Sequence, residues 1–152
     1  STGDGGNGGG LGEAKRAIDG NTDGIYANGS VTHTRGSDTS WWMVDLGADK
    51  QHTITSVYIY NRLDCCMDRL PAADVQVLDS FDNIITFHTI GAGDIRSVYS
   101  FDFGGVQGRY VRIQKICVDV TGSCDYLHLD LAEVEVMGFS AAPSPTPMPI
   151  HR

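Results

Sequence analysis

Seven short runs rich in β-branched and aromatic residues, each bounded by turn-forming residues, constrain the fold of this chain more than any other feature. The runs are 41–46, 53–61, 74–78, 84–90, 98–103, 109–116 and 131–137. Runs of this length and composition predict β-strands. A single short segment, 11–18, favours a helix. The chain is therefore predicted to be all-β.

The faces of two runs can be read from their alternation. Val111 and Ile113 alternate with Arg112 and Gln114, and the run 131–137 alternates valine with glutamate. Such strands have one buried and one solvent-facing side, as is typical of antiparallel sheets. We therefore expect an antiparallel β-sandwich or jelly roll, with binding sites on the loops at one end.

The two ends of the chain differ in composition from its middle. Residues 1–10 are rich in glycine, and the segment 141–152 contains four of the five prolines. Sequences of this kind remain extended or flexible because they cannot bury enough apolar surface to fold. We therefore expect one domain at 11–139 between linkers at 1–10 and 140–152. Linkers on both sides are typical of a module from a longer protein with further domains, although two simple disordered ends are equally compatible.

The charge of the chain disfavours two classes of partner. Its 152 residues include 19 Asp and Glu against 11 Lys and Arg, a formal net charge of −8, with no basic run. An acidic surface repels nucleic-acid phosphates and anionic lipid headgroups. No apolar stretch approaches the ~20 residues that span a bilayer, and the first residues lack the pattern of a secretion signal. We expect no nucleic-acid partner and no membrane insertion.

The four cysteines, Cys65, Cys66, Cys117 and Cys124, allow three sets of pairings. Local pairing is favoured, with Cys117 and Cys124 closing a turn-rich loop. Adjacent Cα atoms lie about 3.8 Å apart, below the ~4.4 to 6.8 Å usual for a disulfide. A Cys65–Cys66 bridge would be strained, and such strain persists mainly where a site uses it. The alternative is two free thiols. Under either interpretation the composition indicates an exported protein more than a cytosolic one.

Charged side chains surround the adjacent cysteines. Arg62, Asp64 and Arg69 all follow the run 53–61 within one loop. A carboxylate between two arginines can hold their planar guanidinium groups in fixed directions, which leaves N–H donors for a neutral ligand rich in hydroxyl groups. A sugar has this chemistry. The alternative is a solvated surface ion pair of little energetic weight.

A second polar segment has the oxygen-rich composition of a cation site. Residues 19–24, DGNTDG, match the opening of an EF-hand calcium loop, but Ser30 occupies the twelfth position instead of glutamate. The segment is therefore no EF-hand. It could still bind a cation if a distant carboxylate completes the ligand shell, or it could form an ordinary Asx-turn. The glycosylation sequon at Asn28 carries little weight because such sequons are frequent by chance.

One histidine, His33, precedes the tryptophans at 41 and 42 in a polar loop, and by itself such a residue means little. The other four histidines are expected to be ordinary surface or locally bonded residues. They are His52, His88, His128 and His151.

Taken together, these motifs resemble the F-type lectins, or fucolectins, over residues 11–139. The matching segments are AIDGN at 17–21, GSVTHT at 29–34, WWMVDLG at 41–47, ITSVYIYNRLDCCMDR at 54–69, GRYVRI at 108–113 and LAEVEV at 131–136. The family's sugar motif is a histidine followed at a distance by Arg-x-Asp, four residues, and then Arg or Lys. Four residues fill it here: His33, Arg62, Asp64 and Arg69. Cys65 and Cys66 coincide with the family's vicinal disulfide.

The resemblance implies a discoidin-like β-jelly roll that binds L-fucose at one end without catalysis. By matching residues, His33 and Arg69 are expected to contact the axial 4-hydroxyl, and both arginines the ring and 3-hydroxyl oxygens. Asp64 is expected to orient the two arginines. The Cys65–Cys66 pair would lie under the apolar edge of the sugar, with Tyr26 near its methyl group.

The resemblance also implies a structural Ca²⁺ near the sugar. The expected ligands are the side chains of Asp19, Asn21, Ser30 and Glu133 and the backbone oxygens of Arg16, Ser30 and Ala132.

Two departures from the family pattern stand out. The gap of 28 residues between His33 and Arg62 is longer than usual, which predicts an enlarged loop at 34–40. Val31 and Ala132 replace two cysteines that are linked in some relatives; because both are absent, no unpaired thiol remains.

The sequence therefore predicts a secreted or cell-surface, calcium-containing lectin domain whose partners are fucosylated glycans. One alternative is a discoidin-type adhesion module for another glycan, a lipid or a protein surface. A thiol hydrolase using Cys65 or Cys66 with His33 would need a free thiolate. A glycosidase would need two carboxylates at a set separation, and the sequence offers no clear pair. We expect no enzyme.

Overall fold

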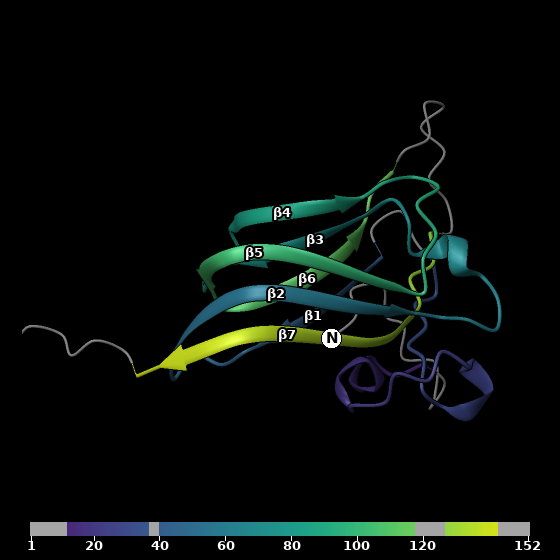
Figure 1. Cartoon of the computed structure of the whole chain (residues 1–152), viewed down its shortest axis with the longest axis horizontal. Coiled ribbons are helices and arrows are strands. Elements are labelled where there is room, and N and C mark those ends of the chain that lie inside the picture. Colours follow the sequence, from purple (N-terminus) through teal and green to yellow (C-terminus); the bar gives the residue numbers. More distant parts are fainter. Residues whose placement is uncertain (1–11, 37–39, 118–126, 143–152) are drawn as a thin grey trace, which may run out of the picture.

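Two antiparallel sheets pack face to face in this protein (Figure 1). The computed structural model describes residues 12–36, 40–117 and 127–142. The first sheet has the order β1 (Trp41–Asp45), β6 (Tyr110–Lys115), β3 (Ala73–Leu78) and β4 (Ile84–Ile90). The second has the order β5 (Val98–Gly108), β2 (Gln51–Asn61) and β7 (Leu131–Ala141). The predicted all-β sandwich is confirmed, and each of the seven predicted runs forms a strand.

The helical content of the described chain is limited to three 3₁₀ helices, η1 (Ala14–Ile18), η2 (Tyr26–Asn28) and η3 (Met67–Arg69). Of the helix predicted at 11–18, the described part, from residue 12 on, contains only the five residues of η1. This helix is attached to the sandwich because Ala17 is buried and the indole Nε1 of Trp42 donates a hydrogen bond of 2.9 Å to the Ala14 carbonyl. None of the described helices has the length and apolar character needed to cross a membrane.

The core lies between the sheets and follows the alternation read from the sequence. Val111 and Ile113 of β6 are fully buried, as are Val57 and Ile59 of β2. Burying a side chain of this size contributes about 1.5–3 kcal/mol relative to leaving it exposed. One expected solvent-facing residue departs from the pattern: Glu133 of β7 is 4% exposed because η1 packs against that strand.

The second sheet bends at a β-bulge. The register of β2 against both of its neighbours shifts between Ile54 and Ser56. On β7, a Cβ added to Gly138 would collide with the carbonyl oxygen of Thr53. Only glycine therefore lets β7 follow β2 around the bend.

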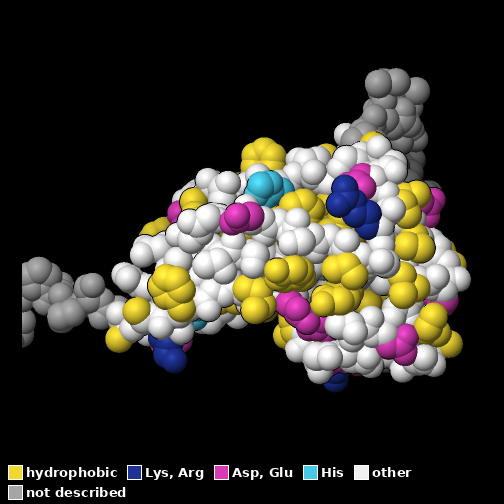
Figure 2. Space-filling view, in the orientation of Figure 1, with side chains coloured by type: hydrophobic (Ala, Val, Ile, Leu, Met, Phe, Trp, Pro, Cys, Tyr) yellow, Lys and Arg dark blue, Asp and Glu magenta, His cyan; other side chains and the backbone are white. Residues whose placement is uncertain are grey.

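The outer face of the second sheet carries many apolar side chains, as Figure 2 shows in the orientation of Figure 1. Val98, Met137 and Phe139 are among the exposed large hydrophobic residues of its strands. Figure 1 also shows that the 3₁₀ helices gather at the end of the sandwich where β2 ends and β7 begins. This is the end to which the predicted site residues belong.

The predicted domain boundaries are only partly visible. Ser140 and Ala141 belong to β7, so the ordered domain extends slightly beyond the boundary expected at residue 139. The linkers predicted at 1–10 and beyond residue 142, and also Cys124 and His151, lie outside the described residues.

Candidate functional site

A short backbone ladder places His33 opposite an aspartate that precedes β7. Thr32 N–H donates to the Leu131 carbonyl at 2.8 Å, and Thr34 N–H donates to the Leu129 carbonyl at 3.2 Å. The two threonine hydroxyls in turn accept hydrogen bonds from Leu131 N–H at 3.0 Å and Leu129 N–H at 2.9 Å. His33 lies between the threonines, and Asp130 lies between the leucines. The ladder therefore fixes the two polar residues beside each other.

Asp130 is the shared partner of the predicted sugar-binding side chains. Its carboxylate is fully buried, and its Oδ1 accepts a hydrogen bond from His33 Nδ1 at 2.7 Å. Its Oδ2 accepts one from Arg69 at 3.0 Å and lies 3.7 Å from an Arg62 nitrogen. Its role is not predicted from the sequence, because an aspartate that alternates with leucines has the pattern of an exposed strand position.

The expectation that Asp64 orients both arginines is correct for Arg62 and wrong for Arg69. Asp64 accepts hydrogen bonds from Arg62 at 2.7 and 3.4 Å, whereas Arg69 donates to Asp130. The hydrogen bond from Arg62 lowers the pKa of Asp64 and, reciprocally, raises the pKa of Arg62. The two arginines are thus held by two different carboxylates, because η3 carries Arg69 toward the start of β7.

Tyr26 joins this cluster from η2. Its ring lies under the Arg62 guanidinium, at 4.6 Å from ring centroid to Cζ, and meets the His33 ring edge-on at 6.0 Å. Its backbone N–H donates to Asp64 at 3.3 Å. Cation–π contact and hydrogen bonding together fix the direction of the Arg62 side chain. The structure therefore places the predicted residue Tyr26 within the cluster.

Cys65 and Cys66 form the predicted vicinal disulfide, with Cα atoms 3.8 Å apart. Cys66 adopts a left-handed backbone with φ of 60° and precedes η3 as its N-cap residue, and Arg69 N–H donates to the Cys66 carbonyl at 3.0 Å. The buried Asn61 amide donates to the carbonyls of Met67 and Arg96, both at 3.0 Å, and so attaches this turn to the sandwich.

The alternative with free thiols is wrong for the described residues, because no cysteine among them is free. Cys117 also forms a disulfide, but its predicted partner Cys124 lies outside the described ranges. A thiol hydrolase at Cys65 or Cys66 would therefore lack its nucleophile.

A buried lysine, not foreseen from the sequence, supports the turn that carries Arg69. Lys115 Nζ donates to the carbonyls of Arg69, at 2.8 Å, and Pro71. Burial lowers the pKa of this ammonium group to about 8, although the charge of Asp68 acts in the opposite direction. The lysine satisfies two carbonyl groups that the polypeptide would otherwise bury without partners.

The residues predicted to bind calcium come together beside this cluster. Gly20 N–H donates to Glu133 at 3.2 Å, and the oxygens of Asp19 and Asn21 accept backbone N–H groups two residues further on. The loop is therefore a series of Asx-turns. Within the described ranges, no group of three or more His, Cys, Asp or Glu side chains is arranged to hold a metal.

Ser30 is the most enclosed polar residue predicted for this site. Its hydroxyl donates to the Ile25 carbonyl at 3.0 Å, and it is fully buried, as is Ala132 on β7. Arg16 donates to the Val31 carbonyl at 3.1 Å. The expected ligands thus lie on η1, the loop after it, the segment just after η2 and the start of β7.

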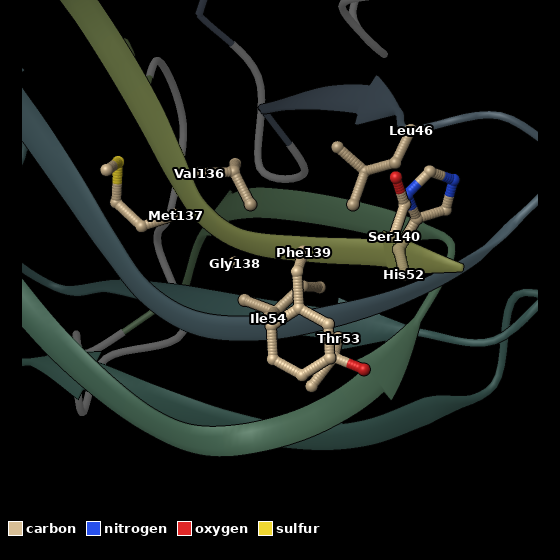
Figure 3. Close-up of a pocket in the computed structure, with 9 residues that line it drawn as sticks. All are labelled: Leu46, His52, Thr53, Ile54, Val136, Met137, Gly138, Phe139 and Ser140. Atoms are coloured by element: carbon tan, nitrogen blue, oxygen red, sulfur yellow. The ribbon is translucent and has the colours of Figure 1, made fainter.

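Two hollows lie away from these residues, where β2 begins and β7 ends. The first, with a volume of about 160 Å³, follows the bend of β7 over β2, and Ile54, Val136 and Phe139 are among its lining residues (Figure 3). The second has a volume of about 290 Å³ and lies near Arg109. Neither hollow contains a predicted sugar or calcium ligand.

Comparisons with known proteins agree with the fold and the motifs. Residues 16–113 match the family described as a NedA-like, galactose-binding domain of the F5/F8 type C group. Fucolectin-3 of Anguilla japonica is 36% identical over 141 residues, which cover 88% of this chain and 71% of that protein. The chain belongs to the fucolectin family.

Solved structures place this fucolectin domain among sugar-binding modules. A fucose binding module of Streptococcus pneumoniae is 36% identical, with a TM-score of 0.72 and coverage of 82% of each chain. The lectin domain of lectinolysin complexed with Lewis B antigen is 32% identical, with a TM-score of 0.77 and coverage of 90% of this chain and 91% of that one. A fucolectin from Morone saxatilis is 30% identical, with a TM-score of 0.69 over 85% of this chain.

These relatives are lectins and sugar-binding modules, and the fucolectin domain described here is not an enzyme. The domain spans only part of some relatives, 43% of the Morone saxatilis chain and 40% of the fucolectin of Anguilla anguilla. The expected family membership is confirmed.

Proposed function

We propose that the domain binds L-fucose at the end of glycans through His33, Arg62 and Arg69, next to the Cys65–Cys66 disulfide. One observation carries this proposal. The three side chains that can contact a ligand are each bonded to a carboxylate, Asp130 or Asp64, beside a rigid pair of sulfur atoms. The similarity to a fucose binding module of Streptococcus pneumoniae and to Fucolectin-3 also supports fucose as the ligand.

Fucose is uncharged and has an axial hydroxyl and a methyl group, so its selective binding requires directional donors and an apolar contact. Guanidinium groups already bonded to carboxylates present their remaining N–H donors in fixed directions. The disulfide and Tyr26 supply the apolar surface. At roughly half a kcal/mol per heavy atom, a monosaccharide gains about 5 kcal/mol, a Kd on the order of 0.1 mM.

Weak single sites become useful when several act together. Linked binding modules raise the overall affinity without any new contact, provided that the geometry permits simultaneous binding. We infer that the natural partners are fucosylated glycans on surfaces or soluble carriers, bound by a secreted or cell-surface protein that carries more than one such domain.

A bound Ca²⁺ is part of this proposal, since the donors present suit the ion. Burial, together with the charge of the nearby Asp19, raises the pKa of Glu133 to about 7. A divalent cation would relieve this crowding of carboxylates, and oxygen donors are the ligands that calcium prefers. Asp19, Asn21, Ser30 and Glu133 would hold the ion, with backbone oxygens of Arg16 and Ala132. Its role would be to fix the loop that leads to Tyr26.

The site is tested by replacing Arg62 or Arg69 with alanine and measuring retention on a fucose column. We expect both variants to lose retention while their far-ultraviolet circular dichroism stays unchanged. Arg109→Ala is the matched control, because Arg109 forms an ion pair with Asp45 at the other end of the sandwich, and it should be retained like the parent. Retention of either site variant would disprove the assignment. If the parent protein does not bind fucose but binds galactose or lipid vesicles, the alternative of an adhesion module would be favoured.

A further inference from the structure

We propose that Asp130 is a positioning residue that fixes the direction of the hydrogen bond His33 offers to a ligand. The site then selects a hydroxyl group that donates one hydrogen bond and accepts another at the same time. This inference rests on the proposed sugar-binding function and adds to it the hydrogen-bond polarity that a bound group must have.

The polarity follows from the chemistry of a carboxylate. Asp130 is fully buried, and its Oδ1 lies 2.7 Å from His33 Nδ1. An ionised carboxylate can only accept hydrogen bonds, so Nδ1 of His33 carries the hydrogen. When the ring carries this single hydrogen, Nε2, on its opposite edge, is a hydrogen-bond acceptor. The His33 side chain is 31% exposed, whereas the Asp130 carboxylate is not exposed at all, so Nε2 is the nitrogen available to a ligand.

Arg69 supplies the complementary donor. Its guanidinium has donors only, and one N–H is used at 3.0 Å by Oδ2 of the same Asp130 carboxylate. Arg69 is also 31% exposed, so its other N–H groups remain for a ligand. The two oxygens of one carboxylate thus hold the imidazole and the guanidinium group beside each other.

A single hydroxyl group can satisfy both. Its oxygen accepts from Arg69, and its hydrogen is donated to His33 Nε2, which closes a ring of hydrogen bonds through Asp130. A fluorine or a methoxy group at the same position can only accept, so His33 would lose its partner. Sites built to hydrogen-bond a hydroxyl reject analogues that lack it, because a desolvated polar group is left unpaired.

Asp64 provides the matched control. Asp64 accepts hydrogen bonds from Arg62 at 2.7 Å and from the Tyr26 backbone N–H at 3.3 Å. Among the described residues it forms no hydrogen bond with an imidazole. Removing the charge of Asp64 should weaken the hydrogen bonds that orient Arg62, without altering the direction of the His33 hydrogen bond.

The first experiment measures the affinity of methyl α-L-fucoside and of its monodeoxyfluoro analogues at C2, C3 and C4 by calorimetry. For the parent domain, we expect one analogue to bind at least about tenfold more weakly than the fucoside, the loss expected for an unpaired buried polar group. Asp130→Asn keeps the shape, but its amide can donate to Nδ1 and so permits the opposite imidazole tautomer. In this variant the fucoside should bind more weakly and the penalty for that analogue should shrink to about threefold or less.

Asp64→Asn should lower all affinities and preserve the parent's ratio between fucoside and analogue. The same ratio in Asp130→Asn would overturn the inference, since a merely structural role weakens all ligands equally. Failure of the parent domain to bind the fucoside would instead reject the proposed function.

A second measurement needs no variant and therefore does not depend on whether Asp130→Asn folds. Long-range ¹H–¹⁵N correlation spectra of the parent domain distinguish protonated from unprotonated imidazole nitrogens. We expect His33 to carry its hydrogen on Nδ1 alone at neutral pH. A hydrogen on Nε2, with Nδ1 bare or also protonated, would overturn the inference.

Discussion

At the scale of single residues, Lys115 shows how a buried charge couples the stability of the domain to pH. Burial lowers its pKa in the folded protein from the ordinary value of 10.5 to about 8. Between these values the unfolded chain binds more protons than the folded one, so the free energy of unfolding should rise with pH. Below this window both states carry the charge, and the cost of burying it is fully present.

Lys115→Met tests this coupling. We expect the increase in unfolding free energy between about pH 8 and pH 10, which is about 3 kcal/mol at most for a shift of this size, to be smaller in the variant than in the parent domain. Urea titrations at several pH values measure it. Equal slopes for parent and variant would show that Lys115 does not contribute to the pH dependence.

Some residues of the site can be predicted from the sequence and others cannot. His33, Arg62 and Arg69 follow a spaced motif and were predicted, whereas Asp130 and Lys115 were not. For Asp130, alternation with leucines predicts solvent exposure. Lys115 lies on the same face of its strand as Val111 and Ile113, but a lysine at the end of a strand is seldom buried. Both residues are buried by segments distant in sequence, Asp130 by the ladder with residues 32–34 and Lys115 by the turn after η3. Single-sequence patterns contain no information on such long-range contacts.

At the scale of elements, Asn61 joins the end of β2 to the turn that carries the site. Its side-chain amide donates hydrogen bonds to the carbonyls of Met67 and Arg96. Asn61→Ala leaves two acceptors without this donor, which should lower the unfolding free energy by about 1–3 kcal/mol. It should also weaken fucose binding, because η3 and Arg69 follow the same turn. Chemical denaturation and calorimetry measure the two effects.

Asn83→Ala serves as the control for this variant. Asn83 donates to Asp79 in an exposed turn, so its loss should change stability by less than about 0.5 kcal/mol and leave binding unchanged. If Asn61→Ala behaves like Asn83→Ala, the amide does not support the site.

The elements themselves were largely predictable from hydrophobic periodicity. All seven strands were located because each alternates or clusters β-branched residues between turn formers. The order β1-β6-β3-β4 was not predictable, since neighbours such as β1 and β6 lie far apart in the chain. The helix predicted at 11–18 is longer than the 3₁₀ helix observed at Ala14–Ile18. The hydrogen bond from Trp42 to the Ala14 carbonyl, which holds this short helix against the sandwich, is a long-range contact that the local pattern does not contain.

At the scale of the whole molecule, the proposed calcium site connects the N-terminal segment to the sandwich. Asp19 and Asn21 belong to the loop after η1, and Glu133 belongs to β7. An ion held by both parts binds the folded state but has no formed site in the unfolded chain. Its binding energy therefore adds to the stability of the entire domain.

We accordingly expect saturating Ca²⁺ to raise the melting temperature. At a free concentration of 100 times Kd the gain is about 2.7 kcal/mol, which for a domain of this size is a shift of roughly 5–10 °C. Scanning calorimetry with calcium and with chelator measures it. Glu133→Gln keeps the shape of the side chain but removes a charged ligand, so its melting temperature should respond far less to calcium. Asp45→Asn, at the opposite end of the sandwich, should respond like the parent. Identical melting curves with calcium and with chelator in the parent domain would contradict the proposed site, whatever the sugar affinity.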